Sequence, residues 1–191
     1  MSWIKTITYS NASAILKRVY DRVKGPGNYI DNVFLVHSLR PRTLKGHMSL
    51  YKNTIHNPNN SLPKWYLEAV GVYVSHLNGC DYCVAHHSEG FKRLYPDSEQ
   101  ALQFLKAVQE DRIADVFDGQ YLLGMDYARR LTVELQSITQ TYIESLKASG
   151  FSDGEILELN QVIGYFNYGN RTALGLGVSL NGDVLGVVPE V

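Results

Sequence analysis

Both cysteines of this 191-residue chain lie in one short segment, NGCDYCVAHH, at residues 78–87. Two residues separate Cys80 from Cys83, and the pair His86 and His87 follows closely. Cysteines at this spacing can cycle between dithiol and disulfide, ligate zinc, or serve as small buried apolar residues. A structural zinc site needs four ligands and usually draws on a second such pair, which this sequence lacks. The spacing therefore favours redox chemistry over metal binding and inert packing.

Helix geometry brings three of these side chains to one face. On an α-helix, positions 80, 83 and 87 lie at about 0°, 300° and 340° around the axis, and His86 lies farther off at about 240°. Cys80 follows Gly79 near the expected helix start, where free backbone N–H groups favour a thiolate. His87 can accept a thiol proton directly or through water. We expect an activated dithiol, with Cys80 the more exposed thiol.

Glu68 is the fourth candidate for this site. It follows Trp65-Tyr66-Leu67 and precedes an apolar run, so its helix is expected to be largely buried. A carboxylate on a buried helix needs a partner. A bond to His87 would orient the imidazole and raise its basicity. A salt bridge to Lys64, one turn earlier, is the alternative.

Helix signals dominate the rest of the chain. The β-branched stretch VGVYVSHL at 70–77 resembles a strand, but a proline start and an Asn-Gly stop favour a helix. Ser10-Asn11 is predicted to cap the first helix, and Ser152 with Glu155 forms a capping box for the last. We predict an all-α fold in one domain over residues 1–191, with helices near residues 12–24, 29–38, 41–57, 63–77, 80–94, 96–108, 120–135, 137–148 and 152–180.

Composition narrows the class of protein. The 18 basic and 19 acidic residues leave no positive excess to neutralise phosphates, which argues against nucleic acid as a partner. The first residues lack the apolar region of a signal peptide, and no run reaches the length of a membrane span. Two cysteines in one local motif do not resemble a secreted disulfide scaffold. We therefore expect a cytoplasmic protein with no membrane partner.

Two segments share a faint pattern. Glu68 lies eleven residues before Gly79, and Glu158 lies eleven residues before Gly169, with apolar or aromatic residues between. This predicts an internal pseudo-repeat whose second copy, at about 150–180, has lost its cysteines. Asn170 and Ala173 stand where the two cysteines would be. Similar helix-capping patterns are the alternative explanation.

The pattern Glu68-x11-Cys80-x2-Cys83-x3-His87 resembles the alkylhydroperoxidase D (AhpD) family, within the carboxymuconolactone decarboxylase-like superfamily. The segment SLPKWYLEAVGVYVSHLNGCDYCVAHH is similar to the core of that family, and the whole chain is similar to its peroxidase-related subgroup. The strong match covers residues of about 60–90, and the order of helices supports the remainder. The resemblance implies an all-helical AhpD-like bundle built from a pseudo-repeat.

The resemblance also implies a function. It implies a thiol peroxidase that needs no cofactor and no metal ion, takes a hydroperoxide as substrate and is restored by an external dithiol. Carried over by position, Cys83 resembles the peroxidatic thiol and Cys80 the resolving thiol, with Glu68 and His87 as the proton relay. It further implies a homo-oligomer, either a trimer or a hexamer.

One departure from the family pattern concerns the proton relay. The best-known members carry a histidine between the cysteines, where this chain has Asp81-Tyr82. His86 or a water molecule could substitute, or the relay could be shorter. A general thiol–disulfide oxidoreductase and a non-catalytic oligomeric sensor are the alternative functions. The remaining histidines are expected to be ordinary surface or core residues: His37, His47, His56 and His76.

Overall fold

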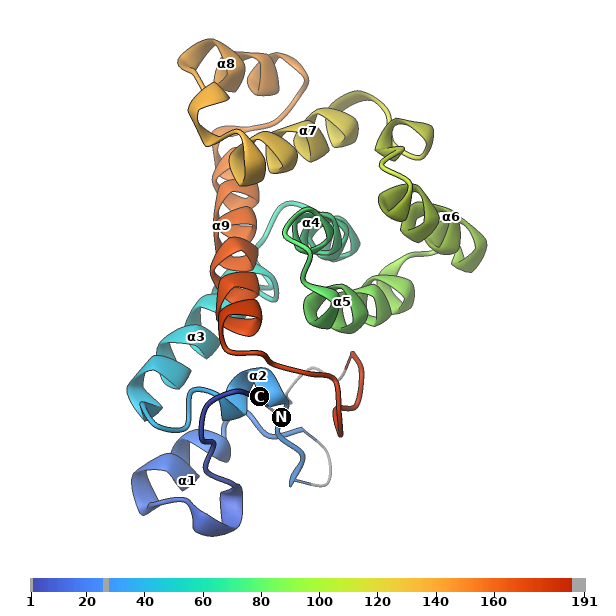
Figure 1. The fold of residues 1–191 in the computed structure, drawn as a ribbon. Helices are drawn as coiled ribbons and strands as arrows, with labels where there is room; N and C mark the ends of the chain where they lie inside the picture. The colour runs from blue at the N-terminus through green and yellow to red at the C-terminus, as the bar shows by residue number, and fades with distance from the viewer. Residues whose placement is uncertain (1, 26–27, 187–191) are drawn as a thin grey trace.

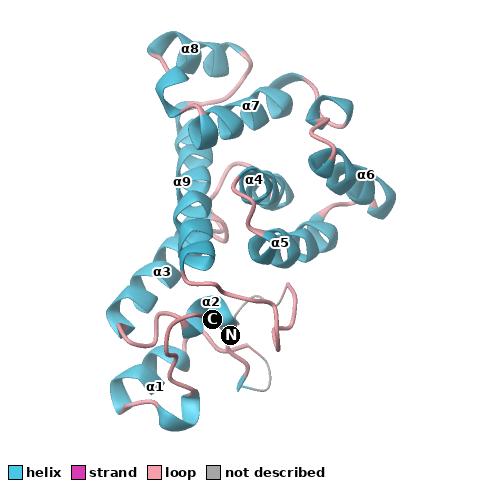
Figure 2. Ribbon diagram, viewed as in Figure 1, coloured by secondary structure: helices cyan, strands magenta, loops and turns pink. Residues whose placement is uncertain are grey.

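The computed structural model describes residues 2–25 and 28–186, and these are helical or loop, with no strand among them (Figure 2). The predicted all-α class is confirmed, and Figure 1 shows the arrangement of the helices. The helices are α1 (Ala14–Tyr20), α2 (Asn32–Leu35), α3 (Pro41–Thr54), α4 (Lys64–Leu77), α5 (Asp81–Leu94), α6 (Ser98–Gln109), α7 (Gly119–Val133), α8 (Gln140–Ala148) and α9 (Asp153–Gly175), with short 3-10 turns at Tyr9–Asn11, Ile113–Asp115 and Leu135–Ser137.

Helix α4 is the central element, with α5, α7 and α9 packed around it (Figure 1). Ten consecutive residues of α4, from Tyr66 to Ser75, are buried. A helix that is apolar on every side belongs in a core, which explains why its β-branched residues do not form a strand. Pro63 precedes the first turn, where its missing N–H is not needed. The predicted helix over 63–77 is confirmed within one residue.

The turn between α4 and α5 is a Schellman motif that delivers the cysteines. Gly79 has φ +67°, the Gly79 N–H donates to His76 O at 2.8 Å, and the Cys80 N–H donates to Ser75 O at 2.9 Å. A side chain would be strained at this φ, so glycine suits the turn. Cys80 is consequently the N-cap of α5, and Cys83 lies in its first turn.

The last helix is well defined at both ends. The predicted capping box between Ser152 and Glu155 is present at its start. Helix α9 ends at Gly175, five residues earlier than expected, because a second Schellman motif reverses the chain there. Gly177 has φ +60°, and the Val178 N–H donates to Ala173 O at 2.9 Å.

Several other boundaries also differ from the sequence-based expectation; α3 ends at Thr54 rather than near residue 57, and α8 begins at Gln140 rather than near residue 137. The first helix is capped by Ser13, whose hydroxyl accepts the Leu16 N–H, while residues 9–11 form a separate 3-10 turn. Helix α2 covers four residues of the ten expected at 29–38. The valine-rich tail at 184–188, whose β-branched residues could favour an extended segment, is a loop as far as Gly186, and its last two positions lie outside the described residues.

The proposed pseudo-repeat stays a prediction. Gly169, which the repeat would pair with the helix-ending Gly79, lies inside α9, and the glycine that follows the end of this helix is Gly177.

In the part of the chain that the structure describes, no helix combines the length and the apolar character that crossing a membrane would require.

Candidate functional site

The two thiols are free, buried and in contact. Their sulfur atoms lie 3.0 Å apart, so either thiol can donate its S–H to the other. Cys80 is 1% exposed and Cys83 is 7% exposed. The expectation that Cys80 would be the more exposed thiol is wrong, because the turn after α4 folds it inward against Ala173 and Val178. Cys83 lines a cavity.

The thiol pair ionises asymmetrically. A hydrogen bond from the Cys83 thiol lowers the pKa of Cys80 below that of an ordinary thiol, and the Cys83 backbone N–H and the Asn170 amide act in the same direction against burial. The same hydrogen bond, together with burial and the charge on Cys80, raises the pKa of Cys83. The pair therefore carries one negative charge most readily on Cys80, with the shared proton on Cys83.

Asn170 ties the thiol pair to helix α9. Its Nδ2 donates to Ser75 Oγ at 3.0 Å, and its Oδ1 accepts from Asn78 Nδ2 at 2.9 Å. Asn170 is fully buried and lines the cavity with Cys83. The residue that the pseudo-repeat aligned with Cys80 thus lies beside the thiols, in a supporting position that the sequence did not predict.

Of the two partners that the sequence offered for Glu68, the structure contains His87. His87 Nδ1 donates to Glu68 Oε2 at 2.7 Å, and the carboxylate, 2% exposed, can only accept. This bond leaves Nε2 of His87 as the ring atom available for proton transfer. Among the described residues, the Glu68 carboxylate lies close to the rings of His87 and His56, and it forms no ion pair with Lys64.

Two glycines make this contact possible. A Cβ on Gly90 of α5 would lie 3.2 Å from the Glu68 carboxylate, so glycine lets α5 approach that group closely. A Cβ on Gly71 of α4 would overlap the Phe166 ring of α9. That ring in turn packs edge-on against the His87 imidazole, with centroids 4.6 Å apart. Close helix packing therefore fixes the orientation of His87.

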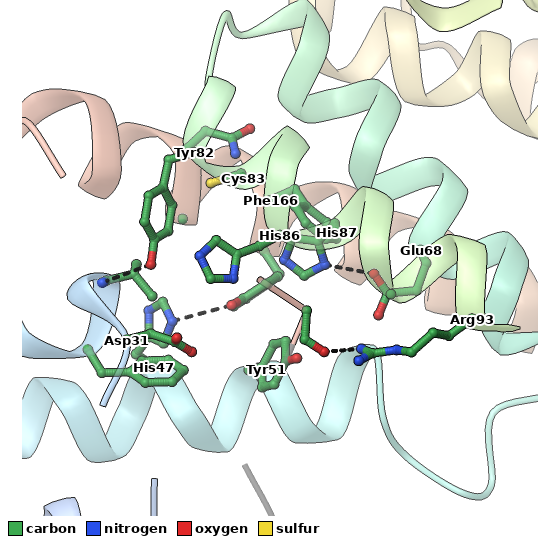
Figure 3. A pocket seen from close by; sticks show the side chains of 17 residues that line it. Asp31, His47, Tyr51, Glu68, Tyr82, Cys83, His86, His87, Arg93 and Phe166 are labelled. Carbon is green, nitrogen blue, oxygen red and sulfur yellow. Dashed lines mark hydrogen bonds and ion pairs between the residues drawn. The ribbon is translucent and has the colours of Figure 1, made fainter. Parts of the chain in front are cut away.

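The cavity has a volume of about 60 Å³. Figure 3 shows its walls: His87 points toward Glu68, while the neighbouring His86 lies toward Tyr82 and Asp31. Apolar and aromatic side chains from α3, α9 and the α2 region complete the lining: Val33, Phe34, Tyr51, Tyr165 and Phe166. The Arg93 guanidinium donates to the carbonyl of Gly186 and so holds the tail over one edge. Cys83, His87 and Glu68 all line the cavity, whereas Cys80 contacts Cys83 and does not line it.

The other side of the cavity is lined by Asp31, with Asp183 close by, and the sequence indicated neither carboxylate. His86 Nε2 lies 3.4 Å from Asp183 Oδ2, to which the Tyr82 hydroxyl donates at 2.6 Å. Burial alone would raise the pKa of Asp183, but the nearby His86 imidazole and the hydroxyls of Tyr82 and Tyr29 outweigh it and lower that pKa. Asp31 lies beside this group, and its burial raises its pKa to about 6.

Two histidines expected to be ordinary belong to the surroundings of the site. His56 Nε2 lies 3.9 Å from Glu68 Oε1, and burial lowers the pKa of His56. His47 lines the cavity, contacts the Tyr165 hydroxyl at 3.3 Å, and has its pKa lowered by burial to about 3. Both are therefore neutral imidazoles at pH 7. Their positions depend on α3 and on the loop before α4, for which the sequence offers no spacing signal.

Comparison with known proteins rests on structure. No protein-family model matches the chain, and no curated protein matches it. An uncharacterized peroxidase-related protein from Silicibacter sp. TM1040 has a TM-score of 0.70 at 23% identity, covering 80% of this chain and 78% of that one. A peroxidase-related protein from Ralstonia eutropha JMP134, described as an alkylhydroperoxidase AhpD core, has a TM-score of 0.78 at 20% identity, covering 99% and 98%.

A third similar structure is that of an enzyme with a different activity. It is a cysteine-to-alanine variant of the debrominase Bmp8 in complex with 2,3,4-tribromopyrrole, with a TM-score of 0.74 at 16% identity over 95% of each chain. At sequence identities this low, the structural similarity establishes a shared fold and nothing more. The protein therefore has the all-helical AhpD-like fold, as the resemblance around Cys80 and Cys83 implies.

Proposed function

We propose that the protein is a thiol peroxidase of the alkylhydroperoxidase type, with Cys83 as the attacking thiol. The observation that carries the proposal is a buried pair of free thiols, 3.0 Å apart, at a cavity shared with the His87–Glu68 pair. A cavity of about 60 Å³ has room for a few water-sized groups. It accommodates a small hydroperoxide, or the –OOH end of a larger one.

The first step uses the proton shared by the thiols. Because the pKa of Cys80 is lowered and that of Cys83 is raised, the singly ionised form of the pair is a Cys80 thiolate with a Cys83 thiol. As peroxide enters, the Cys83 proton moves to Cys80, and the Cys83 thiolate attacks the terminal oxygen. The O–O bond breaks, Cys83 becomes a sulfenic acid, and the alkoxide leaves. Protonated His87, held by Glu68, gives its proton to that alkoxide, which leaves as an alcohol.

The second step closes the cycle. Cys80 passes the proton that it took from Cys83 to the now neutral His87, and the Cys80 thiolate attacks the Cys83 sulfenic acid to give a disulfide. The hydroxide that leaves takes this proton from His87 and departs as water. An external dithiol then attacks the disulfide at Cys83, the sulfur that lines the cavity, reduces it and is itself oxidised. Peroxide is thus reduced by two electrons that come ultimately from the dithiol. The contact between the two sulfur atoms supports this step, since little movement is needed to join them.

Thiol–disulfide exchange is a second candidate, favoured by the lowered pKa of Cys80. In that case Cys80 would attack a disulfide substrate. Its burial argues against this role, because a protein disulfide cannot reach a thiol that is 1% exposed.

Reductive debromination is a third candidate, favoured by the similarity in fold to Bmp8 and by the aromatic cavity walls. The Cys83 thiolate would take a bromine from an aromatic ring, which gains a proton. Cys80 would then displace bromide and form the same disulfide. Debromination and peroxide reduction both oxidise the two thiols to one disulfide, so the two reactions differ only in their substrate.

The deciding experiment measures free thiols and intact mass before and after one equivalent of hydrogen peroxide or cumene hydroperoxide. We expect rapid loss of both thiols and of two hydrogen atoms from the wild-type chain. Cys80→Ser should accumulate a sulfenic acid that dimedone traps at Cys83, whereas Cys83→Ser should react at the slow rate of an ordinary thiol. A parallel run with 2,3,4-tribromopyrrole tests debromination.

Rapid peroxide consumption by Cys83→Ser would overturn the assignment of Cys83. If both thiols survive excess peroxide, the peroxidase proposal is wrong. Disulfide formation with tribromopyrrole in place of peroxide would then assign debromination, and fast exchange with a small disulfide at Cys80 would assign the exchange reaction.

A further inference from the structure

A second group of chemically active side chains lies apart from the thiols. Asp31, His86 and Asp183 come from the segment before α2, from α5 and from the tail. One donor atom from each lies within 4.8 Å of the other two. The proposed thiol cycle assigns a role to none of them, and their convergence from three distant segments needs its own explanation.

Asp31 is the least satisfied member of the group. Its side chain lines the cavity, the residue is 7% exposed, and Oδ1 has no hydrogen-bond partner. Nε2 of His86 also lacks a hydrogen bond, although it faces Asp183. Buried carboxylate oxygens are normally paired with a cation or with donors. An ion pair between His86 and Asp183 would leave the free oxygen of Asp31 unexplained.

We propose that Asp31, His86 and Asp183 form a binding site for a divalent transition-metal ion, best suited to Zn²⁺. Two carboxylate oxygens and one imidazole nitrogen are a donor set that zinc accepts, with a fourth position left open. Tetrahedral ligands at 2.0–2.1 Å from zinc lie about 3.4 Å from one another. The distance from His86 Nε2 to Asp183 Oδ2 is 3.4 Å.

Neighbouring groups hold the proposed ligands in place. The Tyr82 hydroxyl donates to Asp183 Oδ2 at 2.6 Å and accepts the Val33 N–H at 3.2 Å. The Asn32 N–H donates to both oxygens of Asp183 at 3.2 Å. Hydrogen bonds of this kind orient carboxylate ligands and leave a second lone pair on the oxygen for a metal ion.

The charge balance supports the same assignment. With His86 neutral, two ionised carboxylates carry two negative charges in a poorly hydrated space. A divalent cation neutralises both, whereas protonated His86 neutralises only one. The ion would share the cavity with Cys83 without entering the thiol cycle, since Asp31 and His86 lie on the side away from Glu68 (Figure 3).

The test uses the Cys80→Ser/Cys83→Ser chain, so that thiols cannot bind the probe ion. We expect calorimetric titration with Zn²⁺ to show one ion per chain, and Co²⁺ to give the visible absorption of a tetrahedral N/O site. Asp31→Asn and His86→Gln should each weaken binding by at least about tenfold. Asp81→Asn and His76→Gln, which alter the same residue types outside the group, should leave binding unchanged.

Absence of saturable binding, or equal affinity in Asp31→Asn, His86→Gln and the parent, would overturn the proposal. Circular dichroism checks that each variant is folded, and if one unfolds the other decides. Because the readout is binding to a chain without thiols, the result is independent of whether the protein reduces peroxides.

Discussion

The two consecutive histidines of α5 face unlike partners. His87 bonds to Glu68, which comes from the central helix α4. His86 faces Asp183 from the tail and Asp31 from the segment before α2. The first pair is fixed by two helices joined through a three-residue turn, whereas the partners of His86 come from loop segments that lie 55 and 97 residues away along the sequence. One helix thus presents adjacent imidazoles to two chemically different sites.

The two histidines are held in different ways, His87 by packed helices and His86 by hydrogen-bonded loops. Around His87, the backbone of α4, the Phe166 ring and Gly90 leave almost no freedom. Around His86, a small number of hydrogen bonds hold the tail, chiefly through Asp183. The helical side is suited to a proton transfer that needs fixed geometry, and the loop side is suited to a group that binds and releases.

Removing the charge of Glu68 should have the largest effect. Glu68→Gln keeps the shape and one acceptor but removes the carboxylate that stabilises protonated His87. We expect the rate of Cys83 oxidation by peroxide to fall about 100-fold. Stopped-flow measurement of thiol loss checks this. Glu89→Gln, which alters a partly exposed acid on α5 paired with Lys92, is the matched control and should react as wild type. Equal rates in both variants would remove Glu68 from the relay.

Overpacking should show how tightly the helical side is built. In Gly71→Ala the new methyl group meets the Phe166 ring, and we expect a loss of about 2 kcal/mol in unfolding free energy. Gly164→Ala, in α9 with open space around its Cβ, should instead gain roughly 0.5–1 kcal/mol from helix propensity. Urea unfolding of both variants measures the difference. A neutral Gly71→Ala would mean that Phe166 can move aside without cost.

A third histidine of the cavity wall should report through pH. Burial lowers the pKa of His47 to about 3, whereas an unfolded histidine titrates near its ordinary value. The unfolded chain therefore binds the proton first, and stability falls as pH drops below about 6.5, with a slope of about 1.4 kcal/mol per unit. Unfolding free energies at several pH values should show a shallower acid slope for His47→Gln than for wild type. Parallel slopes would contradict this account.

The smallest expected effect concerns the loop side. Tyr82→Phe removes the hydroxyl that joins Asp183 to the Val33 N–H. We expect a loss of about 1 kcal/mol in unfolding free energy. Hydrogen exchange should also accelerate at the Asn32 and Val33 amides while the amides of α4 keep their protection. Unchanged exchange at these amides would mean that the tail is held by other contacts.

The sequence predicted the parts of the site that depend on helices. Helical spacing placed Cys83 and His87 on one face, and the burial of the α4 segment predicted a partner for Glu68, which is His87. The Asn-Gly sequence correctly ended α4, and Ser152 with Glu155 correctly started α9. These succeed because the signals lie within a few residues of the elements that they govern.

The remainder depends on contacts that no local pattern encodes. Nothing near Asp31 or Asp183 in the sequence indicates that the two carboxylates meet. His47 and His56 were expected to be ordinary, and only the packing of α3 brings them to the cavity and its surroundings. Cys80 was expected to be the more exposed thiol, since helix position alone ignores the inward turn after Gly79. The homo-oligomer and the cytoplasmic location stay predictions.

The separation of the two sides along the chain also bears on the order of folding. The α4–α5 hairpin closes through a short turn, and such local contacts form early. The contact between Asn32 and Asp183 closes a loop of 151 residues, which costs more chain entropy and can be gained only after the intervening helices have collapsed. We expect the thiols and His87 to be assembled in a folding intermediate or transition state before Asp183 reaches Asp31 and His86. The cavity would then acquire its second half in the last stage of folding.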